Sequence, residues 1–322
     1  MNIKKIGLTA LAGSLVATSA YAADVSISGG ASVAIYKNND KSKTQYYQND
    51  SVTFTVSGET DGGLTVTTSI ELDGDSGGTT GAVDSRSIKI SSAEMGTLTF
   101  AGHGGDSVIG GWDDVTPSAY EEVWALTKNS TMSTTSANIV LNGGSGNNLW
   151  RYDSPSFSGL SVHASYNSAS ASSGRESSYS DIGVMIAPEM VEGLSLGYAV
   201  GEFDESASIL GVDASTMWAK YAYGPVTVGI QSTDYDAPTA ANSDDSNAVG
   251  ISYAVSDALS ISYGSHTVDI GGATSDQESE GYSVSYTMGG ATIAASKNKT
   301  DNIRGSAAND EDSYEINVSF AF

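Results

Sequence analysis

The stretch S-Y-E-I-N-V-S-F-A-F (residues 313–322) alternates large apolar side chains with small or polar ones. The apolar parity holds Tyr314, Ile316, Val318, Phe320 and Phe322, and the other parity holds Glu315, Asn317, Ser319 and Ala321. Successive side chains of a β-strand point to opposite sides, so a period of two is typical of a strand with one apolar and one hydrophilic face. The stretch therefore predicts a strand that separates two such environments.

The same alternation recurs along the chain from residue 24 onward. In an early segment Val25 and Ile27 alternate with Ser26 and Ser28. We predict sixteen strands, at 25–37, 50–58, 63–73, 84–92, 96–102, 147–154, 159–167, 178–188, 193–202, 214–223, 225–233, 246–255, 258–267, 280–288, 290–297 and 312–322.

The connections between these segments alternate between tight and long. Tight ones, such as 60–63 and 289–290, contain Gly and Asp in turn-forming order, whereas long ones, such as 38–49 and 234–245, are rich in Asp, Asn, Ser and Gly. A soluble β-sandwich also alternates, but it lacks this difference between its two ends. About nine residues at ~3.3 Å each, tilted by ~40°, span roughly 23 Å, close to the ~25 Å apolar band of an outer-membrane barrel.

The fold class that follows is all-β: a 16-stranded antiparallel transmembrane β-barrel with short periplasmic turns and long extracellular loops. Hydrocarbon offers no hydrogen-bond partners to an open sheet edge, so the last strand is expected to pair with the first. A barrel of this size is too wide for side chains to fill, which predicts a water-filled lumen lined by the polar parity.

Composition excludes several classes of function. Of the 322 residues, 14 are Lys or Arg and 38 are Asp or Glu, which gives a net charge of −24. This charge excludes a nucleic-acid partner held by phosphate contacts. The chain has no cysteine, so disulfides and Cys-based metal sites are excluded.

The N-terminal residues 1–22 have the features of a cleaved signal peptide. Lys4 and Lys5 precede the apolar stretch 6–16, and Ala20-Tyr21-Ala22 forms an A-x-A cleavage site. A first membrane anchor is the alternative, but the stretch is short for it. We expect an exported barrel of residues 23–322, with a net charge of −26 because the two lysines are lost (12 basic minus 38 acidic residues).

One connection, 102–146, is far longer than the others. A structureless loop of this length argues against a fold assignment unless it has a function. It alternates apolar anchors with carboxylates: if it folds inward, Trp112, Tyr120, Val123, Trp124 and Leu126 can pack on the inner wall while its acidic residues point into the aperture. The pore would then be narrow and acidic.

Residues 148–160 (N-L-W-R-Y-D-S-P-S-F-S-G-L), directly after this connection, resemble a strand-turn segment of the general porins of Gram-negative outer membranes. The terminal aromatic, Phe322, is similar to the signal by which such barrels are recognised for insertion. The resemblance covers the chain from residue 23 to its end. It implies a homotrimer of sixteen-stranded barrels in the outer membrane, among lipid and lipopolysaccharide, each with an infolded third loop that constricts the pore.

In this family the carboxylates of the infolded loop face basic residues on the opposite wall. By resemblance the acidic half of the constriction is Asp106, Asp113, Asp114, Glu121 and Glu122. Strand parity places Lys89, Arg151 and Lys220 on the lumen side as the basic half, a sparser set than the family pattern. There is an alternative for each half of this constriction. In it the carboxylates are only solvated by water, and the three cations serve only in structural ion pairs.

These features predict a passive diffusion channel for ions and small hydrophilic solutes that prefers cations, because an acidic narrow channel concentrates them. A solute-selective porin is the nearest alternative, and a secreted soluble β-rich surface or adhesion protein is a more distant one. We expect no enzymatic activity, since no G-x-S-x-G nucleophile elbow is present.

We expect no cofactor. The acidic outer loops raise the alternative of loop-bound calcium, for which Asp73 and Asp75 are the candidate ligands, but they do not match the twelve-residue EF-hand pattern.

Overall fold

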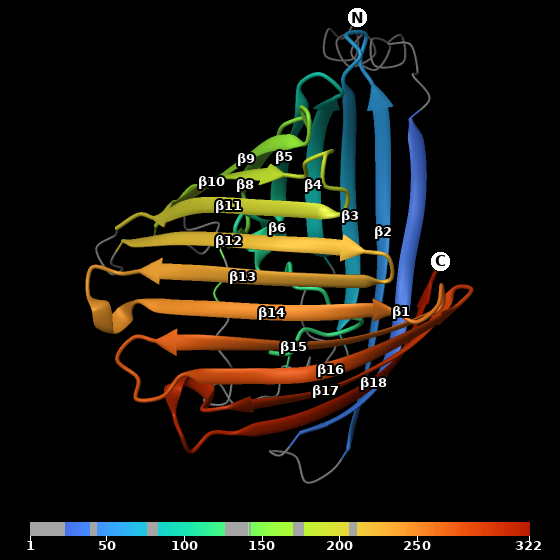
Figure 1. The fold of residues 1–322 in the computed structure, drawn as a ribbon. Helices are drawn as coiled ribbons and strands as arrows, with labels where there is room; N and C mark the ends of the chain where they lie inside the picture. The colour runs from blue at the N-terminus through green and yellow to red at the C-terminus, as the bar shows by residue number, and fades with distance from the viewer. Residues whose placement is uncertain are drawn as a thin grey trace, which may run out of the picture.

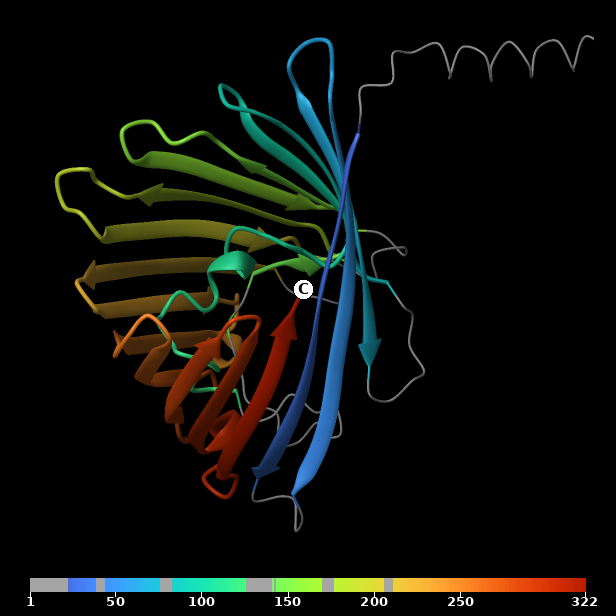
Figure 2. The same ribbon diagram turned by 90° about the vertical axis from the view of Figure 1, so that its right-hand side faces the viewer.

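The computed structural model describes residues 23–38, 44–75, 83–125, 141, 143–169, 177–205 and 211–322. These residues form a closed antiparallel barrel of sixteen strands (Figures 1 and 2). The barrel strands are β1 (Asp24–Asn38), β2 (Gln45–Glu59), β3 (Thr65–Asp75), β4 (Val83–Ser92), β5 (Gly96–His103), β8 (Leu149–Asp153), β9 (Leu160–Asn167), β10 (Tyr179–Ile186), β11 (Leu194–Phe203), β12 (Val212–Tyr223), β13 (Val226–Asp236), β14 (Asp244–Ala254), β15 (Leu259–Ile270), β16 (Gln277–Met288), β17 (Ala291–Asp301) and β18 (Glu311–Ala321). The predicted number of strands and the fold class are confirmed.

Closure occurs between the first and last strands, as predicted. β1 pairs with β2 on one side and with β18 on the other, with Val33 opposite Val318 and Ile35 opposite Ile316. The main chain of Phe322 exchanges two hydrogen bonds with Gly29, of 2.8 and 3.0 Å. The ladder therefore leaves no open edge, which satisfies the backbone polar groups that hydrocarbon would leave unpaired.

Alternation separates the outer and inner faces of the strands. In β16, Tyr282, Val284 and Tyr286 are exposed on the outer face, while Gly281 and Ser283 are buried on the inner face. Tyrosines on other strands share this outward orientation; examples are Tyr166, Tyr198, Tyr223, Tyr253, Tyr263 and Tyr314. The apolar residues thus face outward, the reverse of a soluble protein.

The two ends of the barrel differ as the sequence predicts. Tight turns such as 224–225 and 289–290 lie at one end, and the longer connections lie at the other. Several strands extend further toward the long-loop end than the alternation indicated; β2 begins at Gln45 and β13 ends at Asp236. Backbone pairing does not require apolar side chains, so the ladder continues past the apolar band into polar residues.

The remaining elements are small. A two-stranded sheet joins β6 (Gly105–Asp106) to β7 (Ser145–Gly146), and three 3-10 turns lie at η1 (Gly110–Trp112), η2 (Ala240–Asn242) and η3 (Ile303–Gly305). In the described part of the chain, no helix has both the length and the apolar character to cross a membrane. The buried apolar clusters lie inside the barrel, and two of them join residues of the connection 104–148 to the wall.

Candidate pore constriction

The segment between β5 and β8 turns into the barrel instead of staying at its rim (Figure 2). Its neck is closed by the pairing of β6 with β7, in which Gly105 lies opposite Gly146. The amide of Ser107 donates to the carbonyl of Gly144 over 2.9 Å. His103 and Asn147 share a side-chain hydrogen bond at the same place. The described residues 105–125 then continue along the inner wall, while 126–140 and 142, which include the predicted anchor Leu126, lie outside the described residues.

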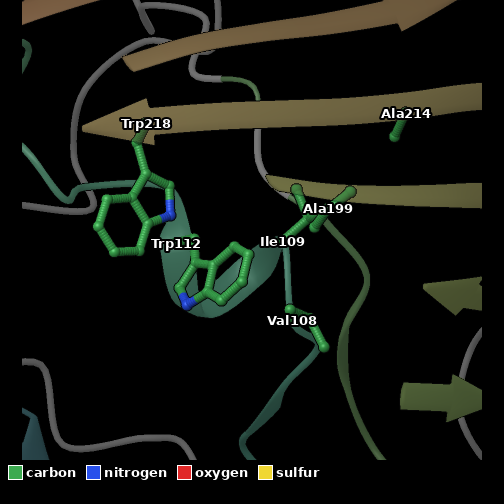
Figure 3. Packing of buried hydrophobic residues seen from close by; sticks show 6 residues of the cluster. All are labelled: Val108, Ile109, Trp112, Ala199, Ala214 and Trp218. Carbon is green, nitrogen blue, oxygen red and sulfur yellow. The ribbon is translucent and has the colours of Figure 1, made fainter. Parts of the chain in front are cut away.

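The first contact of this segment with the wall is apolar. Val108, Ile109 and Trp112 are buried against Ala199 of β11 and against Ala214 and Trp218 of β12 (Figure 3). The rings of Trp112 and Trp218 meet edge to face, with centroids 5.6 Å apart and planes at 85°. Burial of a large apolar side chain contributes about 1.5–3 kcal/mol. This cluster therefore fixes the start of the segment to β11 and β12.

A buried carboxylate on β10 reinforces this contact. Asp181 is 6% exposed, and its Oδ2 accepts hydrogen bonds from the amide of Ile109 (2.9 Å) and from the hydroxyl of Tyr179 (3.0 Å). The hydroxyl of Ser165 donates to its Oδ1. The carboxylate thus holds the first turn of the segment. Asp181 is not among the site residues predicted from the sequence. Its lumen-facing parity on β10 does not distinguish it from other polar residues of the wall.

The middle of the segment is held by polar side chains of β13, β15 and β16. Gln231 donates from Nε2 to the carbonyl of Trp112 and accepts at Oε1 from the amide of Val115 over 3.4 Å. The amide of Ala119 donates to the hydroxyls of Ser262 (2.9 Å) and Ser283 (3.2 Å). These contacts satisfy backbone groups that would otherwise be buried without a partner.

Polar and apolar contacts together fix the far end. Trp124 packs against His266 of β15 with ring centroids 4.6 Å apart. Asn298 of β17 donates from Nδ2 to the carbonyls of Glu122 (3.0 Å) and Ala125 (2.8 Å). The hydroxyl of Tyr120 donates to the carboxylate of Glu315 on β18, which is 6% exposed.

The anchors just described fall on β10–β18, so the described segment covers that side of the inner wall. The inner faces of β2–β5, on the other side, carry many half-buried hydroxyls, one lysine, and the carboxylates Glu71 and Asp73 of β3. The hydroxyls and the lysine are Thr53, Thr55, Ser57, Thr67, Ser69, Ser87, Lys89, Thr97 and Thr99. Among the described residues, the lumen is therefore bounded by the segment on one side and by a hydroxyl-rich wall on the other.

The five loop carboxylates differ in exposure. Asp106 and Asp114 are exposed, and Asp113 and Glu122 are half-buried. Glu121 is 8% exposed and lies close enough to Tyr47 and Tyr120 for its charge to act on both phenols. Four of the five carboxylates are therefore at least partly exposed, whereas Glu121 is buried near Tyr47 and Tyr120.

Burial and mutual repulsion disfavour the charged forms of three of these groups. Partial burial, with the neighbouring charges of Asp114 and Asp106, raises the pKa of Asp113 to about 6. Partial burial, with the charges of Glu121 and Asp114, raises the pKa of Glu122 to about 7. Burial also raises the pKa of Asp106, although the guanidinium of Arg151 opposes the effect. The carboxylates therefore form one electrostatically linked group.

Of the three basic candidates, Arg151 contacts the loop directly. Its Nη1 donates to the carbonyls of Ser107 (2.9 Å) and Asp106 (3.4 Å), and its Nε lies 3.1 Å from Oδ1 of Asp153. The same carboxylate oxygen lies 2.7 Å from Nδ1 of His163. Arg151 thus fastens the start of the loop, and its charge is shared with Asp153.

The two lysines lie apart from this network. Lys89 is exposed on the inner face of β4, opposite Thr67 and Thr99. Lys220 is half-buried on the inner face of β12, opposite Gly229. Within the described ranges no ion pair joins either lysine to a loop carboxylate. The structure therefore brings the acidic residues together but leaves the basic ones dispersed.

Two further sequence candidates lie outside the constriction. Asp73 lies on β3 near Glu71 and Asp50, and Asp75 ends that strand. Among the residues that the structure describes, no group of three or more His, Asp or Glu side chains is arranged to hold a metal ion. Phe322 has an exposed side chain beside β1 and makes the main-chain hydrogen bonds with Gly29 given above.

Comparisons with known proteins agree with this architecture. The family model described as Gram-negative porin matches residues 7–287. Comparison with curated protein sequences gives no match. Similar solved structures include an anion-selective porin from Comamonas acidovorans (TM-score 0.69, 14% identity, 93% of this chain and 100% of that one).

Two other similar structures come from different bacteria. They are the trimer form of OmpT, an outer membrane protein of Vibrio cholerae (TM-score 0.69, 13% identity, 94% and 100% covered), and a porin mutant of Rh. blastica (TM-score 0.63, 17% identity, 93% and 100% covered). At these identities the likeness establishes the fold alone, whereas the family model spans most of the sequence. The chain therefore belongs to the Gram-negative porin family and forms an outer-membrane channel, not an enzyme.

Proposed function

We propose that this porin is a passive diffusion channel for ions and small hydrophilic solutes and that it prefers cations. The observation that carries the proposal is the acidic segment anchored inside the lumen along the wall of β10–β18. Asp106, Asp113, Asp114 and Glu122 are its lumen-facing carboxylates. Arg151, which contacts the segment at Asp106 and Ser107, is already paired with Asp153. The excess of carboxylates gives the aperture a negative potential that concentrates cations.

The fold does not decide the sign of the preferred ion. One protein with a similar structure is an anion-selective porin, yet its identity with this chain is only 14%. Ion preference must therefore come from the lumen side chains. In this chain, Lys89 and Lys220 are the described lumen lysines, and both lie away from the carboxylates of the segment.

Passage needs no conformational cycle in this mechanism. A hydrated solute enters between the acidic segment and the hydroxyl-rich wall of β2–β5, and hydroxyls exchange hydrogen bonds with its water shell at little cost. Aperture size excludes large solutes, and the carboxylates attract cations and repel anions. A solute-selective porin is the second candidate, for which we find no favouring observation.

The assembly and export of the chain are part of the same proposal. Residues 1–22 act as a cleaved signal peptide, Phe322 acts in the insertion signal, and the barrel forms a homotrimer in contact with lipid and lipopolysaccharide. The long connections face the exterior and the tight turns face the periplasm. Supporting observations are the A-x-A site at 20–22, the terminal aromatic, and the trimer form of the similar Vibrio cholerae protein.

The test is the reversal potential of the purified porin in a planar bilayer under a potassium chloride gradient. We expect a potential of the sign given by cation preference. The variant Asp113→Asn/Asp114→Asn/Glu122→Gln should bring it close to zero. Glu94→Gln, in the exposed turn between β4 and β5, removes a carboxylate far from the segment and serves as the control. Anion preference of the wild type would overturn the proposal.

A further inference from the structure

Four neighbouring strands place a glycine at the same level of the inner wall. Gly229 of β13 lies opposite Gly250 of β14, Gly250 opposite Gly264 of β15, and Gly264 opposite Gly281 of β16. Directly opposed residues of antiparallel strands point to the same face, so the four glycines form one continuous row across the strands. All four are buried. We call them the glycine row.

The acidic segment lies directly on this row. A methyl carbon added at Gly229 would lie 2.6 Å from Cδ of Pro117, and one added at Gly250 would lie 2.9 Å from the carbonyl oxygen of Pro117. A methyl carbon at Gly264 would lie 3.0 Å from Cγ1 of Val123 and also 3.0 Å from the carbonyl oxygen of Val249 on β14. Carbon atoms pack at about 3.5–4.0 Å, so a methyl group at Gly229 or Gly250 would require the segment to shift, and one at Gly264 would require Val123 to give way.

Gly281, the last glycine of the row, affects the segment through Asn298. A methyl group at Gly281 would overlap the side-chain amide of Asn298. That amide holds the carbonyls of Glu122 and Ala125. Pro117 and Val123, and through Asn298 the carbonyls of Glu122 and Ala125, therefore depend on wall positions that lack a side chain.

Strand stability does not explain these glycines. Glycine in the interior of a strand weakens it and commonly marks a close approach of another backbone. Here the approaching backbone is the segment that carries the constriction carboxylates. We propose that the glycine row is a size-determining element of the pore, because it lets the segment lie flat on the wall and so keeps the aperture wide; this inference rests on the proposed diffusion function.

A side chain in the row should move the segment and not the wall. Each row position is held by ladder hydrogen bonds on both sides, whereas the segment is held by a small number of separate contacts. The distance between the added methyl carbon at Gly229 and Cδ of Pro117 must grow from 2.6 Å to that of normal carbon packing. The segment must therefore move by ~1 Å, and the open direction is into the lumen.

The experiment measures single-channel conductance and the relative entry of a small and a large neutral sugar into proteoliposomes. For Gly229→Ala/Gly250→Ala we expect conductance lower by roughly a third, with the larger sugar slowed more, because flux follows the open cross-section. Gly58→Ala, at a strand glycine with no heavy atom within 4 Å of the added methyl, is the matched control. Conductance equal to that of the wild type in the double variant would overturn the proposal.

A rescue experiment separates steric contact from other effects of the substitution. Pro117→Ala removes the Cδ atom, so Gly229→Ala/Pro117→Ala should recover most of the conductance lost in Gly229→Ala. Gly264→Ala with Val123→Ala gives a second, independent pair if the first variant does not fold. Failure of both rescues would show that the row does not act through the segment. A wild type that conducts no ions would instead refute the diffusion function itself.

Discussion

The inner wall of β10–β18 and the inner wall of β2–β5 follow the same alternation, but their lumen side chains meet different surroundings. On β10–β18 the inner positions hold Asp181, Gln231, Asn298 and Glu315, each bonded to the loop segment, together with the glycine row. On β2–β5 most inner positions hold short hydroxyls, with Lys89 and the carboxylates Glu71 and Asp73 among them. Alternation thus decides which side chains face inward. It does not decide whether they meet water or the folded segment.

Removal of the segment should erase the difference between the two walls and have the largest effect. Deleting residues 108–125 and joining the ends with a short Gly-Ser linker should raise single-channel conductance by roughly two-fold or more, because a sixteen-stranded barrel encloses a wide lumen. Cation preference should fall in parallel. Both are measured in planar bilayers, with heat-modified gel mobility to verify the barrel. Unchanged conductance would contradict the constriction.

Loss of the Asp181 anchor should loosen the segment on the wall of β10–β18. The wall of β2–β5 should stay unchanged. Asp181→Ala leaves the amide of Ile109 and the hydroxyl of Tyr179 without their acceptor. Each unsatisfied buried group costs about 1–3 kcal/mol. We expect open-channel current noise to rise and the segment to become more sensitive to protease. Asp181→Asn keeps an acceptor and should behave nearly as the wild type; equal noise in all three proteins would argue against the anchor.

The acidic side of the aperture should respond to pH. Because the pKa of Asp113 is raised to about 6 and that of Glu122 to about 7, both are largely protonated at pH 5 and ionised at pH 8. Cation preference should therefore increase as pH rises through this window. The docked segment should be less stable over the same rise, since the docked state binds more protons than a freely solvated one. Reversal potentials at pH 5 and 8 test the first effect.

The matched control for this prediction is the variant Asp113→Asn/Glu122→Gln, which lacks both groups. Its reversal potential should change less between pH 5 and 8 than that of the wild type. If the wild type and this variant gave the same pH dependence, the titrating groups would lie elsewhere in the lumen.

The smallest effect is expected on the hydroxyl-rich wall. Lys89→Gln removes its exposed positive charge and should raise cation preference slightly at low salt. Exposed charges are screened with a Debye length of ~3 Å at 1 M salt, so the difference should vanish there. Thr67→Val, at the position opposite Lys89, changes no charge and is the control. A larger effect for Lys89→Gln than for the acidic triple variant would mean that this wall dominates selectivity.

Much of the constriction could be expected from the sequence, but its contacts could not. The length of the connection 102–146 and its alternation of Trp112 and Trp124 with acidic residues predicted inward packing, and both tryptophans are buried on the wall. The partners of the segment were not predictable, because Asp181 and Glu315 look like any lumen-facing polar residue. The nearness of Glu121 to Tyr47, far away in the sequence, was likewise not predictable.

The sequence by itself determined the number of strands, which side of each strand faces outward, and the closure of β1 on β18. These properties follow from a local rule, the period of two, combined with the requirement that every backbone group in the membrane be paired. The tertiary structure alone decided where the segment rests, which carboxylates reach the lumen, and why four strands carry glycine at one level. Those properties depend on contacts between residues far apart in the chain, for which a local pattern carries no information.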